Sequence, residues 1–333
     1  MAEQLGAAVI GLGMMGERHA AIWRELPTTR LVSVYDIVPE RTQAVAEACG
    51  CEAAGSLEAA LDRPDVDLVS VCTDDGRHVE PCLAAAAAGK HILLEKPLAT
   101  SLQDCDAIIA ACASAGVKLM VGHVVRFDPR YAVAQQAIAE GAVGEVIQVY
   151  GRRNNILDSG RRIAPRTSVA FFLGVHDLDL MRWFVGAEAV KVHAEAASKV
   201  LVDVAAEDSI MALLKYENGA VGCLETCWAM PKGIPCTLDA RLEVIGSEGM
   251  VRVTVGDEGC TVISPDRASR PDILYGPHLR GEQHGALRAQ LEHFADCVRL
   301  DREPLISPRD ARAAVELAVA IHESLRTGAP VYL

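Results

Sequence analysis

The sequence predicts an α/β protein of two domains: an N-terminal Rossmann domain on a doubly wound parallel sheet, and a C-terminal α+β domain with an open, mainly antiparallel sheet. Three observations carry this prediction. The chain of 333 residues is longer than one hydrophobic core usually serves. Apolar runs alternate with helical patterns over residues 1–122, whereas beyond residue 122 such runs follow one another with hairpin turns between them. We therefore expect one domain over residues 1–122 and another over residues 123–333.

The N-terminal region alternates between two periodicities. Its apolar runs are typical of strands buried on both faces, and they cover residues 7–12, 31–36, 68–73, 91–95 and 118–122. Helical patterns cover residues 16–25, 39–48, 78–88 and 101–115, with Gly89 and Gly116 as helix stops. Strict alternation with short connections predicts parallel strands, and ligands bind such sheets at the carboxyl ends of the strands.

A glycine-rich loop stands at the carboxyl end of the first predicted strand. Its motif, GLGMMG, follows a strand and opens a helix, which is the context that a dinucleotide-binding loop requires. Gly11 permits the tight turn, Gly13 lets a pyrophosphate approach backbone N–H groups, and Gly16 permits close helix packing. An ordinary turn also uses glycines, but this context favours the nucleotide. The candidate cofactor-binding residues of the loop are Gly11, Leu12, Gly13, Met14, Met15 and Gly16.

Asp36 ends the second predicted strand, 20 residues after Gly16. A carboxylate at this position accepts hydrogen bonds from both ribose hydroxyls and repels a 2′-phosphate. The position therefore predicts NAD rather than NADP as the cofactor.

The stretch LLEKPLAT, residues 93–100, lies at a strand end on the same edge as the glycine loop. Pro97 cannot continue a ladder of hydrogen bonds and biases Lys96 towards an extended conformation. A cis Lys96–Pro97 peptide would suit such a tight turn. We expect Lys96 to point into the crevice that holds the nicotinamide, with Glu95 beside it. An exposed charge pair at a strand end is an equally ordinary interpretation.

The C-terminal region has a different pattern. A helix is expected over about residues 128–140, and two further helices over residues 284–300 and 308–327 carry apolar stripes that indicate core packing. Strand patterns cover residues 145–151, 190–196, 209–216, 220–228, 238–245 and 250–255, with hairpin turns at residues 217–219 and 246–249. Consecutive hairpins predict an antiparallel sheet.

Three ordered motifs give the chain a family resemblance. They are AVIGLGMMGERHA, CTDDGRHVEPCLAAAAAGKHILLEKPLAT and GVHDLDLMRW, and they resemble the glucose-fructose oxidoreductase and inositol dehydrogenase family, often called Gfo/Idh/MocA. The resemblance implies that Lys96 lies by the nicotinamide and the substrate and that His176 is an acid/base residue. It also places His19, Thr73 and His78 in segments that line the cofactor crevice. In relatives the open sheet often packs against another subunit, which implies a homodimer or homotetramer.

One position departs from the family pattern. Many sugar and inositol dehydrogenases of this family carry an aspartate four residues before the histidine, and Phe172 stands there in this chain. The aspartate would fix the tautomer of the histidine, so its loss weakens the case for His176 as the base and favours Lys96. Asp177 and Asp179 could replace the carboxylate, but acids in the first turn of a helix are also favoured by the helix dipole.

Five arginines lie within residues 152–166, which we expect to form a loop before the His176 segment. Guanidinium groups gathered in a chain of net charge -13 would suit a carboxylate or phosphate on the substrate. A solvated loop with salt bridges between subunits is an equally good interpretation. The candidate substrate-binding residues are Lys96, Arg126, Arg153, Asn155 and His176.

Composition narrows the classes of partner. The net charge of -13 argues against nucleic acid and against an anionic membrane surface. The 11 cysteines include no CxxC pair, which indicates thiols in a reducing compartment rather than a disulfide scaffold, and no metal site is expected. We expect a cytoplasmic protein, since no apolar run is long enough to span a bilayer or to serve as a secretory signal.

Together these features predict an NAD-dependent oxidoreductase. It would move a hydride between the nicotinamide and a carbinol or carbonyl carbon of a sugar, an inositol-like cyclitol or a sugar derivative, with Lys96 and His176 at the reacting oxygen. Burial beside the positive nicotinamide can lower the pKa of a lysine enough for proton exchange. Two alternatives stay open: a reductase of a C=C or C=N bond, which Phe172 leaves possible, and a non-catalytic NAD(H)-binding regulator.

Overall fold

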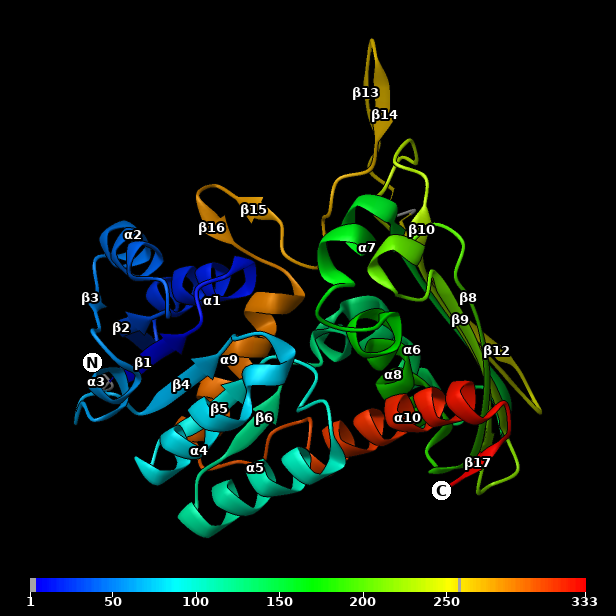
Figure 1. Ribbon diagram of the computed structural model, residues 1–333, viewed down its shortest axis with the longest axis horizontal. Helices are drawn as coiled ribbons and strands as arrows, with labels where there is room; N and C mark the ends of the chain where they lie inside the picture. The colour runs from blue at the N-terminus through cyan, green and yellow to red at the C-terminus, as the bar shows by residue number, and fades with distance from the viewer. Residues whose placement is uncertain (1–3, 257–258) are drawn as a thin grey trace. The chain divides into compact units, whose positions relative to one another are not determined.

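The computed structural model describes residues 4–256 and 259–333, and the chain divides into two compact units (Figure 1). Unit 1 comprises Met1–Val124 and Leu274–Arg312, and unit 2 comprises Val125–Ile273 and Ala313–Leu333. The first division falls close to the expected residue 122. Residues 274–312 differ from the expectation of one domain over 123–333, because they return to unit 1. The periodicity of an amphipathic helix shows that one face is buried, but not which domain buries it.

Unit 1 is built on a six-stranded sheet in the order β3-β2-β1-β4-β5-β6, and all neighbouring strands are parallel. The strands are β1 Leu5–Ile10, β2 Thr29–Tyr35, β3 Glu52–Ala53, β4 Leu68–Val71, β5 His91–Leu94 and β6 Leu119–Val121. The strand order reverses between β1 and β4, which is the switch point at which such sheets bind ligands. The predicted Rossmann sheet is confirmed.

Helices cover both faces of this sheet (Figure 1). They are α1 Met14–Glu25, α2 Pro39–Cys49, α3 Leu57–Leu61, η1 Asp75–Arg77, α4 Val79–Ala87, α5 Leu102–Ala115 and α9 Ala286–Arg299, and a short hairpin pairs β15 His278–Leu279 with β16 Glu282–Gln283. Local chemistry sets the ends of α5: the Ser101 hydroxyl accepts the N–H of Asp104, and Gly116 ends the helix in a left-handed conformation. In α9 the stripe that includes Leu287 and Leu291 is fully buried.

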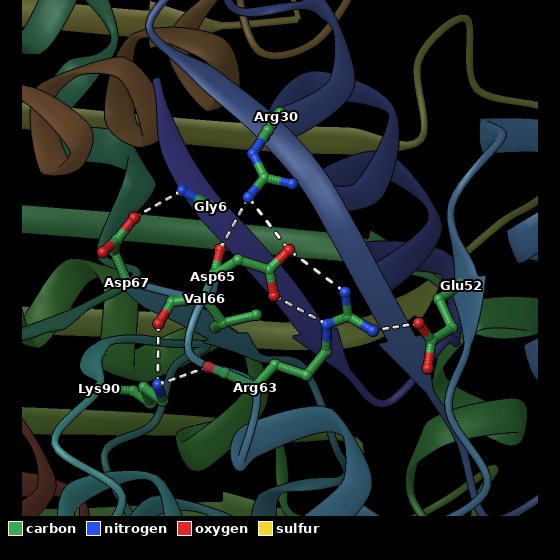
Figure 2. Close-up of polar contacts among 8 residues, drawn as sticks. All are labelled: Gly6, Arg30, Glu52, Arg63, Asp65, Val66, Asp67 and Lys90. Carbon is green, nitrogen blue, oxygen red and sulfur yellow. Dashed lines mark hydrogen bonds and ion pairs between the residues drawn. The ribbon is translucent and has the colours of Figure 1, made fainter. Parts of the chain in front are cut away.

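A cluster of polar contacts lies at the amino-terminal edge of the sheet (Figure 2). The buried Lys90 ammonium donates to the carbonyl oxygens of Val66 at 2.8 Å and Arg63 at 2.9 Å. The N–H of Gly6 donates to Oδ2 of Asp67 at 2.7 Å. The Lys90 and Asp67 side chains thus bind backbone groups at the start of β1 and in the loop before β4, so residues of the chain itself fill this edge of the sheet.

Unit 2 is built on a seven-stranded sheet in the order β12-β11-β7-β10-β9-β8-β17. The strands are β7 Val146–Ile156, β8 Ala189–Ala197, β9 Ser209–Tyr216, β10 Val221–Met230, β11 Leu238–Gly246, β12 Met250–Val255 and β17 Val331–Tyr332. β7 and β10 pair in parallel and the other neighbours pair antiparallel. The predicted mainly antiparallel sheet is confirmed, and a further hairpin joins β13 Val262–Ser264 to β14 Arg267–Ser269.

One face of this sheet carries the helices of unit 2 (Figure 1). The helical segments are η2 Val124–Phe127, α6 Pro129–Ala139, α7 Leu157–Ile163, the π-helical turn η3 Ala170–Gly174, α8 Val175–Val185, η4 Val202–Val204 and α10 Pro308–Thr327, of which unit 2 holds the part from Ala313 onward. Leu224 and Trp228 of β10 face these helices, because a Cβ at Gly174 or Gly160 would contact them.

The expected loop over residues 152–166 is wrong except at its end, where Arg166 lies in a turn. Arg152 and Arg153 belong to β7, and Arg161 and Arg162 belong to α7. β7 pairs with β10 on one side and β11 on the other, so partners on both edges extend the strand to Ile156 despite its polar sequence. The strand propensity of arginine alone could not predict that the strand continues to Ile156.

Within the described residues, no helix is long and apolar enough to cross a membrane.

Candidate active site

The glycine-rich loop of unit 1 has the geometry that a dinucleotide pyrophosphate needs. Gly11 has φ +86°, and a Cβ there would lie 2.7 Å from the backbone nitrogen of Thr73. A Cβ at Gly16 would lie 1.9 Å from the carbonyl oxygen of Gly11, so α1 packs directly on the loop. Gly13 is the N-cap of α1, and no described atom lies within 4 Å of its Cβ position. The first N–H groups of a helix have no partner within the helix, so this open approach can receive a phosphate.

The same loop positions Asp36 at the end of β2. The N–H of the buried Leu12 donates to Oδ2 of Asp36 at 2.7 Å, and the N–H of Val38 donates to Oδ1 at 2.9 Å. Each carboxylate oxygen has a second acceptor site, which leaves capacity for the ribose hydroxyls. The side chain of Met14 is exposed and that of Met15 is half-buried.

A cavity of about 270 Å³ opens beside Asp36. It is lined by Tyr35, Asp36, Ile37, Pro39, Thr42, Gln43, Ala53, Ala54 and Gly55. Its single charged group is the carboxylate, which favours two ribose hydroxyls over a 2′-phosphate. The guanidinium of Arg41, 3.9 Å from Oδ1 of Asp36, is more than half exposed at 56%. The residues present therefore fit the adenosine half of NAD.

The EKP turn follows β5, and Lys96–Pro97 is a cis peptide, as the tight turn suggested. Lys96 is half-buried. His78 is fully buried at the start of α4, with Nδ1 2.9 Å from the Pro97 carbonyl oxygen and Nε2 3.2 Å from the Thr73 carbonyl oxygen. Burial lowers the pKa of His78, so the neutral ring donates to one of these carbonyls. His78 thus joins the loop after β4 to the EKP turn, and its contact with the cofactor stays a prediction.

Glu95 lies in a buried chain of polar contacts. Its Oε1 lies 3.2 Å from Nε2 of His19, whose Nδ1 lies 3.0 Å from the Ser70 hydroxyl. That hydroxyl accepts the indole N–H of Trp23 at 2.8 Å. Because the indole can only donate, the Ser70 hydrogen is available to His19 Nδ1, which leaves the ring proton on the nitrogen that faces Glu95.

The Glu95 carboxyl is ionised. Burial would raise its pKa, but the contact with His19 and the positive charge of Lys96 lower it below the ordinary value. A carboxylate therefore stands next to Lys96 in the chain, inside the protein rather than in water.

His176 lies in the first turn of α8 in unit 2, directly after the π-helical turn η3. Phe172 lies within that turn, and both side chains are half-buried. Single π turns inside helices often accompany functional sites. The position that holds an aspartate in many relatives thus belongs to the same continuous helical segment as His176.

Two buried ion pairs hold the helix that carries His176. Arg153 of β7 donates through Nε to Oδ2 of Asp177 at 2.6 Å, and Arg126 of η2 donates through Nε and Nη2 to Asp179 at 2.8 and 2.6 Å. Burial would lower the pKa of Arg153, but the charge of Asp177 raises it, so the guanidinium stays charged.

The two aspartates are therefore bound to arginines of their own unit, in keeping with a structural role. The Arg126 guanidinium also lies over the Trp183 ring, 5.0 Å from its centroid. Asn155 is half-buried, and its Oδ1 accepts the N–H of Ile156 at 2.7 Å. Contact between a substrate and Arg126, Arg153 or Asn155 stays a prediction.

Sequence reasoning missed Gln290 of α9. Its side chain has no exposed surface, and it stands within the apolar stripe formed by Leu287, Leu291 and Phe294. A polar residue on a stripe that is otherwise apolar was the signal that could have identified it, because such a group needs a polar partner when it is buried.

Both units of the chain match families of known proteins. Residues 5–123 match a model described as "Oxidoreductase family, NAD-binding Rossmann fold", and residues 131–252 match the "GFO/IDH/MocA C-terminal domain". The chain is similar to scyllo-inositol 2-dehydrogenase (NAD(+)) of Bacillus subtilis, with 32% identity over 100% of this chain and 97% of the relative. It is also similar to myo-inositol 2-dehydrogenase of Thermotoga maritima, with 28% identity over 95% of each chain.

A solved structure shares the fold. The crystal structure of myo-inositol 2-dehydrogenase from Lactobacillus plantarum superposes with a TM-score of 0.86 and 23% identity, and the match covers 99% of this chain and 100% of that one. The sequence matches extend over both units, and the first carries the NAD-binding loop and Asp36. The chain therefore belongs to the Gfo/Idh/MocA family of NAD-dependent oxidoreductases.

Proposed function

We propose that the protein is an NAD-dependent dehydrogenase that oxidises a CH–OH group of a cyclitol or a related sugar. The observation that carries this proposal is the combination, within unit 1, of a loop open at Gly13, a cavity with Asp36 as its single charge, and Lys96 on the EKP turn. The named activities of the two full-length relatives support an inositol-like substrate. NAD, when bound, supplies the hydride acceptor.

Lys96 is the residue to which we assign proton exchange with the substrate oxygen. Its ammonium is half-buried and adjoins the ionised Glu95 in the chain. In the oxidising direction the amine form accepts the hydroxyl proton, and in the reducing direction the ammonium donates a proton to the developing alkoxide. In both directions the charge of Lys96 changes, and the protein environment can adjust the pKa of this side chain.

His176 is assigned the assisting role. The Arg153–Asp177 and Arg126–Asp179 pairs fix the first turns of α8, so the backbone of His176 is held by two buried contacts. A rigid backbone holds the His176 side chain in one orientation, which favours contact with a particular atom of the substrate. Of the candidate substrate contacts, Arg153 and Arg126 support the helix in this proposal, while Lys96, Asn155 and His176 contact the polyhydroxylated substrate.

We further propose that the protein is a homo-oligomer in the cytoplasm. On the sheet face of unit 2 that lies opposite its helices, several apolar side chains of neighbouring strands are exposed. They are Met211, Leu213, Val221 and Met250. Exposed apolar side chains gathered on one face are typical of an interface. The 11 cysteines are free thiols, which suits a reducing compartment.

The test is NADH formation at alkaline pH with a panel of inositols, aldoses and sugar acids, and with NADP as the alternative cofactor. Wild type, Lys96→Met and His176→Gln are compared with Lys232→Met, which changes a side chain that is 81% exposed. We expect turnover of a cyclitol by wild type and the control, a large loss in Lys96→Met and a smaller loss in His176→Gln.

The panel also separates the alternatives. Binding of NADH by all four proteins without oxidation of any alcohol would contradict the dehydrogenase assignment and favour reduction of a C=C or C=N bond. Phe172 is the observation that favours this second function, because the position lacks the carboxylate found in many carbinol dehydrogenases of the family.

A further inference from the structure

Residues 274–285 form a strap that leads into α9 and packs on α1 within unit 1 (Figure 1). The strap contains the hairpin of β15 and β16. Glu25, the last residue of α1, anchors the strap and the start of α9: its Oε2 accepts the N–H of Gln283 at 3.1 Å and lies 3.2 Å from Nη1 of Arg288. The strap is therefore bound to the same helix whose first turn forms the candidate site for the cofactor pyrophosphate.

The backbone of Tyr275 is fixed at the start of this strap. Its carbonyl oxygen accepts the N–H of Leu287 at 3.0 Å, and the preceding carbonyl, that of Leu274, accepts the N–H of Ala286 at 2.8 Å. A Cβ at Gly285, which has φ +82°, would lie 2.4 Å from the Leu274 carbonyl oxygen, so this close approach requires glycine. The first turn of α9 thus holds the main chain at Tyr275.

The side chain of Tyr275 extends from this anchor to the glycine-rich loop. It is half-buried, and its hydroxyl donates to Sδ of Met15 at 3.8 Å. Met15 is the second residue of α1 and belongs to the GLGMMG motif. A tyrosine that is 260 residues away in the sequence therefore contacts the loop at which a dinucleotide binds.

The strand order indicates which half of a dinucleotide lies near Tyr275. The cavity at Asp36 follows β2, on one side of β1, whereas β4 and β5 lie on the other side. α9 packs against β5, and its Gln290 packs against Gly122 together with Glu95 of the EKP turn. With the adenosine half at the cavity and the pyrophosphate at the loop, the nicotinamide half belongs on the side of β4 and β5. Tyr275, which is bound to α9, is on that side.

The chemistry of the hydroxyl suits this half of the cofactor. A thioether sulfur is a weak hydrogen-bond acceptor, whereas a carboxamide oxygen and the oxygens of a ribose are strong ones. We propose that Tyr275 is a cofactor-binding residue, whose hydroxyl leaves Met15 when NAD(H) binds and donates to an oxygen of the nicotinamide riboside. The inference concerns binding of NAD(H) and needs no substrate, so it does not rest on the dehydrogenase assignment.

The experiment uses the full chain and two readouts that need no turnover. Calorimetric titration measures the affinities of wild type and Tyr275→Phe for NADH and for ADP, which has the adenosine and the pyrophosphate but no nicotinamide riboside. Tyr332→Phe removes the same hydroxyl from a tyrosine that is 77% exposed and serves as the matched control. Thermal melts establish that each variant is folded. A crystal structure of wild type with NADH gives the position of the Tyr275 hydroxyl.

We expect the Kd for NADH to rise about three- to tenfold in Tyr275→Phe, which is the net contribution of one hydrogen bond. The Kd for ADP should stay within about twofold of the wild-type value, because ADP lacks the group that the hydroxyl binds. Tyr332→Phe should bind both ligands as wild type does. In the crystal, the Tyr275 hydroxyl should lie within hydrogen-bonding distance of an oxygen of the nicotinamide riboside.

Two results would overturn the inference. Equal losses of affinity for NADH and ADP in Tyr275→Phe would show that the hydroxyl serves the half of the cofactor that ADP shares. An unchanged affinity for NADH, with the hydroxyl still at Met15 in the complex, would make the tyrosine a packing contact only. Failure of wild type to oxidise any alcohol would reject the proposed function, and it would not alter either of these binding readouts.

Discussion

The two edges of the parallel sheet in unit 1 differ in how far their polar groups are paired within the protein. At the amino-terminal edge, the Lys90 ammonium and the Asp67 carboxylate bind backbone groups, and Gly6 packs so closely that a Cβ would lie 1.8 Å from the Asp65 carbonyl oxygen. At the carboxyl-terminal edge, the space at Gly13 is open, and Oε1 of the buried Glu95 faces Nε2 of His19 at 3.2 Å without an aligned hydrogen bond.

The difference teaches which edge is built for stability and which for ligands. Pairing every polar group at a strand end stabilises the fold but leaves no group to bind a ligand. Backbone N–H groups without partners and a single carboxylate lower the stability of the free protein. Binding of a ligand to these groups stabilises the folded state. Matched substitutions at the two edges should therefore separate loss of activity from loss of stability.

The largest expected effect is on catalysis at the carboxyl-terminal edge. Lys96→Met should lower kcat/KM about 10²–10⁴-fold, because it removes the proposed proton-transfer group. NADH affinity should change little, and the free energy of unfolding should fall only modestly, through loss of the charge that lowers the pKa of the buried Glu95. Steady-state kinetics, fluorescence titration with NADH and urea unfolding measure the three quantities. Equal losses of activity and stability would break the comparison between the edges.

The matched lysine at the other edge should behave in the opposite way. Lys90→Met leaves the buried carbonyl of Val66 without its donor and removes one of two donors from the carbonyl of Arg63, so the free energy of unfolding should fall by about 1–3 kcal/mol. At a temperature where the variant is folded, its kcat should match wild type. Urea unfolding followed by circular dichroism gives the stability. A stable Lys90→Met variant with impaired turnover would contradict this assignment.

A pair of glycine substitutions sharpens the comparison. Gly6→Ala should destabilise the fold by about 1–3 kcal/mol, because its Cβ would overlap the Asp65 carbonyl. Gly13→Ala adds a methyl group to open space, so stability should change by less than about 0.5 kcal/mol. NADH affinity should instead fall about tenfold, since the methyl group occupies the approach of the pyrophosphate. Calorimetric unfolding and NADH titration test both members.

The cofactor preference depends on one carboxylate at the functional edge. Asp36→Ser removes the charge that repels a 2′-phosphate and leaves the guanidinium of Arg41, now 3.9 Å from that carboxylate, to attract it. We expect the ratio of kcat/KM for NAD to that for NADP to fall about tenfold or more, by loss of charge-assisted hydrogen bonds to the ribose. Arg41→Met in the same background should restore part of the preference; no change in the ratio would show that other groups set it.

The smallest effect is a pH dependence at the amino-terminal edge. Hydrogen bonds from Arg63 and, secondarily, from Arg30 lower the pKa of Asp65 to about 2. A carboxyl whose pKa is lower in the folded state adds stability above its unfolded pKa, and this stability is lost as the pH falls from about 4 towards 2. Asp65→Asn should flatten the pH dependence of unfolding in that window only. The effect should be modest, because the side chain is partly exposed.

Much of the architecture could be predicted from local patterns. Alternating apolar runs and helices predicted the parallel sheet, and GLGMMG with Asp36 predicted the glycine loop and the carboxylate that follows β2. These features depend on residues close in sequence, whose spacing directly sets the turn, the helix start and the strand end.

Features that depend on distant partners could not be predicted in this way. The arginines near residue 153 suggested a loop, whereas β10 and β11 hold that segment as a strand and Asp177 binds the guanidinium. The polarity of a side chain shows that it needs a partner when buried, but not which residue provides one.

The sequence by itself determined the fold class, the cofactor motif and the candidates Lys96 and His176, because periodicity and motif spacing are properties of short segments. Only the tertiary structure decided that α9 returns to unit 1, and that Gln290 and Glu95 both pack against Gly122. It also decided that buried arginines hold the aspartates of α8. The physical reason is that a hydrophobic pattern specifies which face of an element is buried, while the packing of the whole chain decides what that face meets.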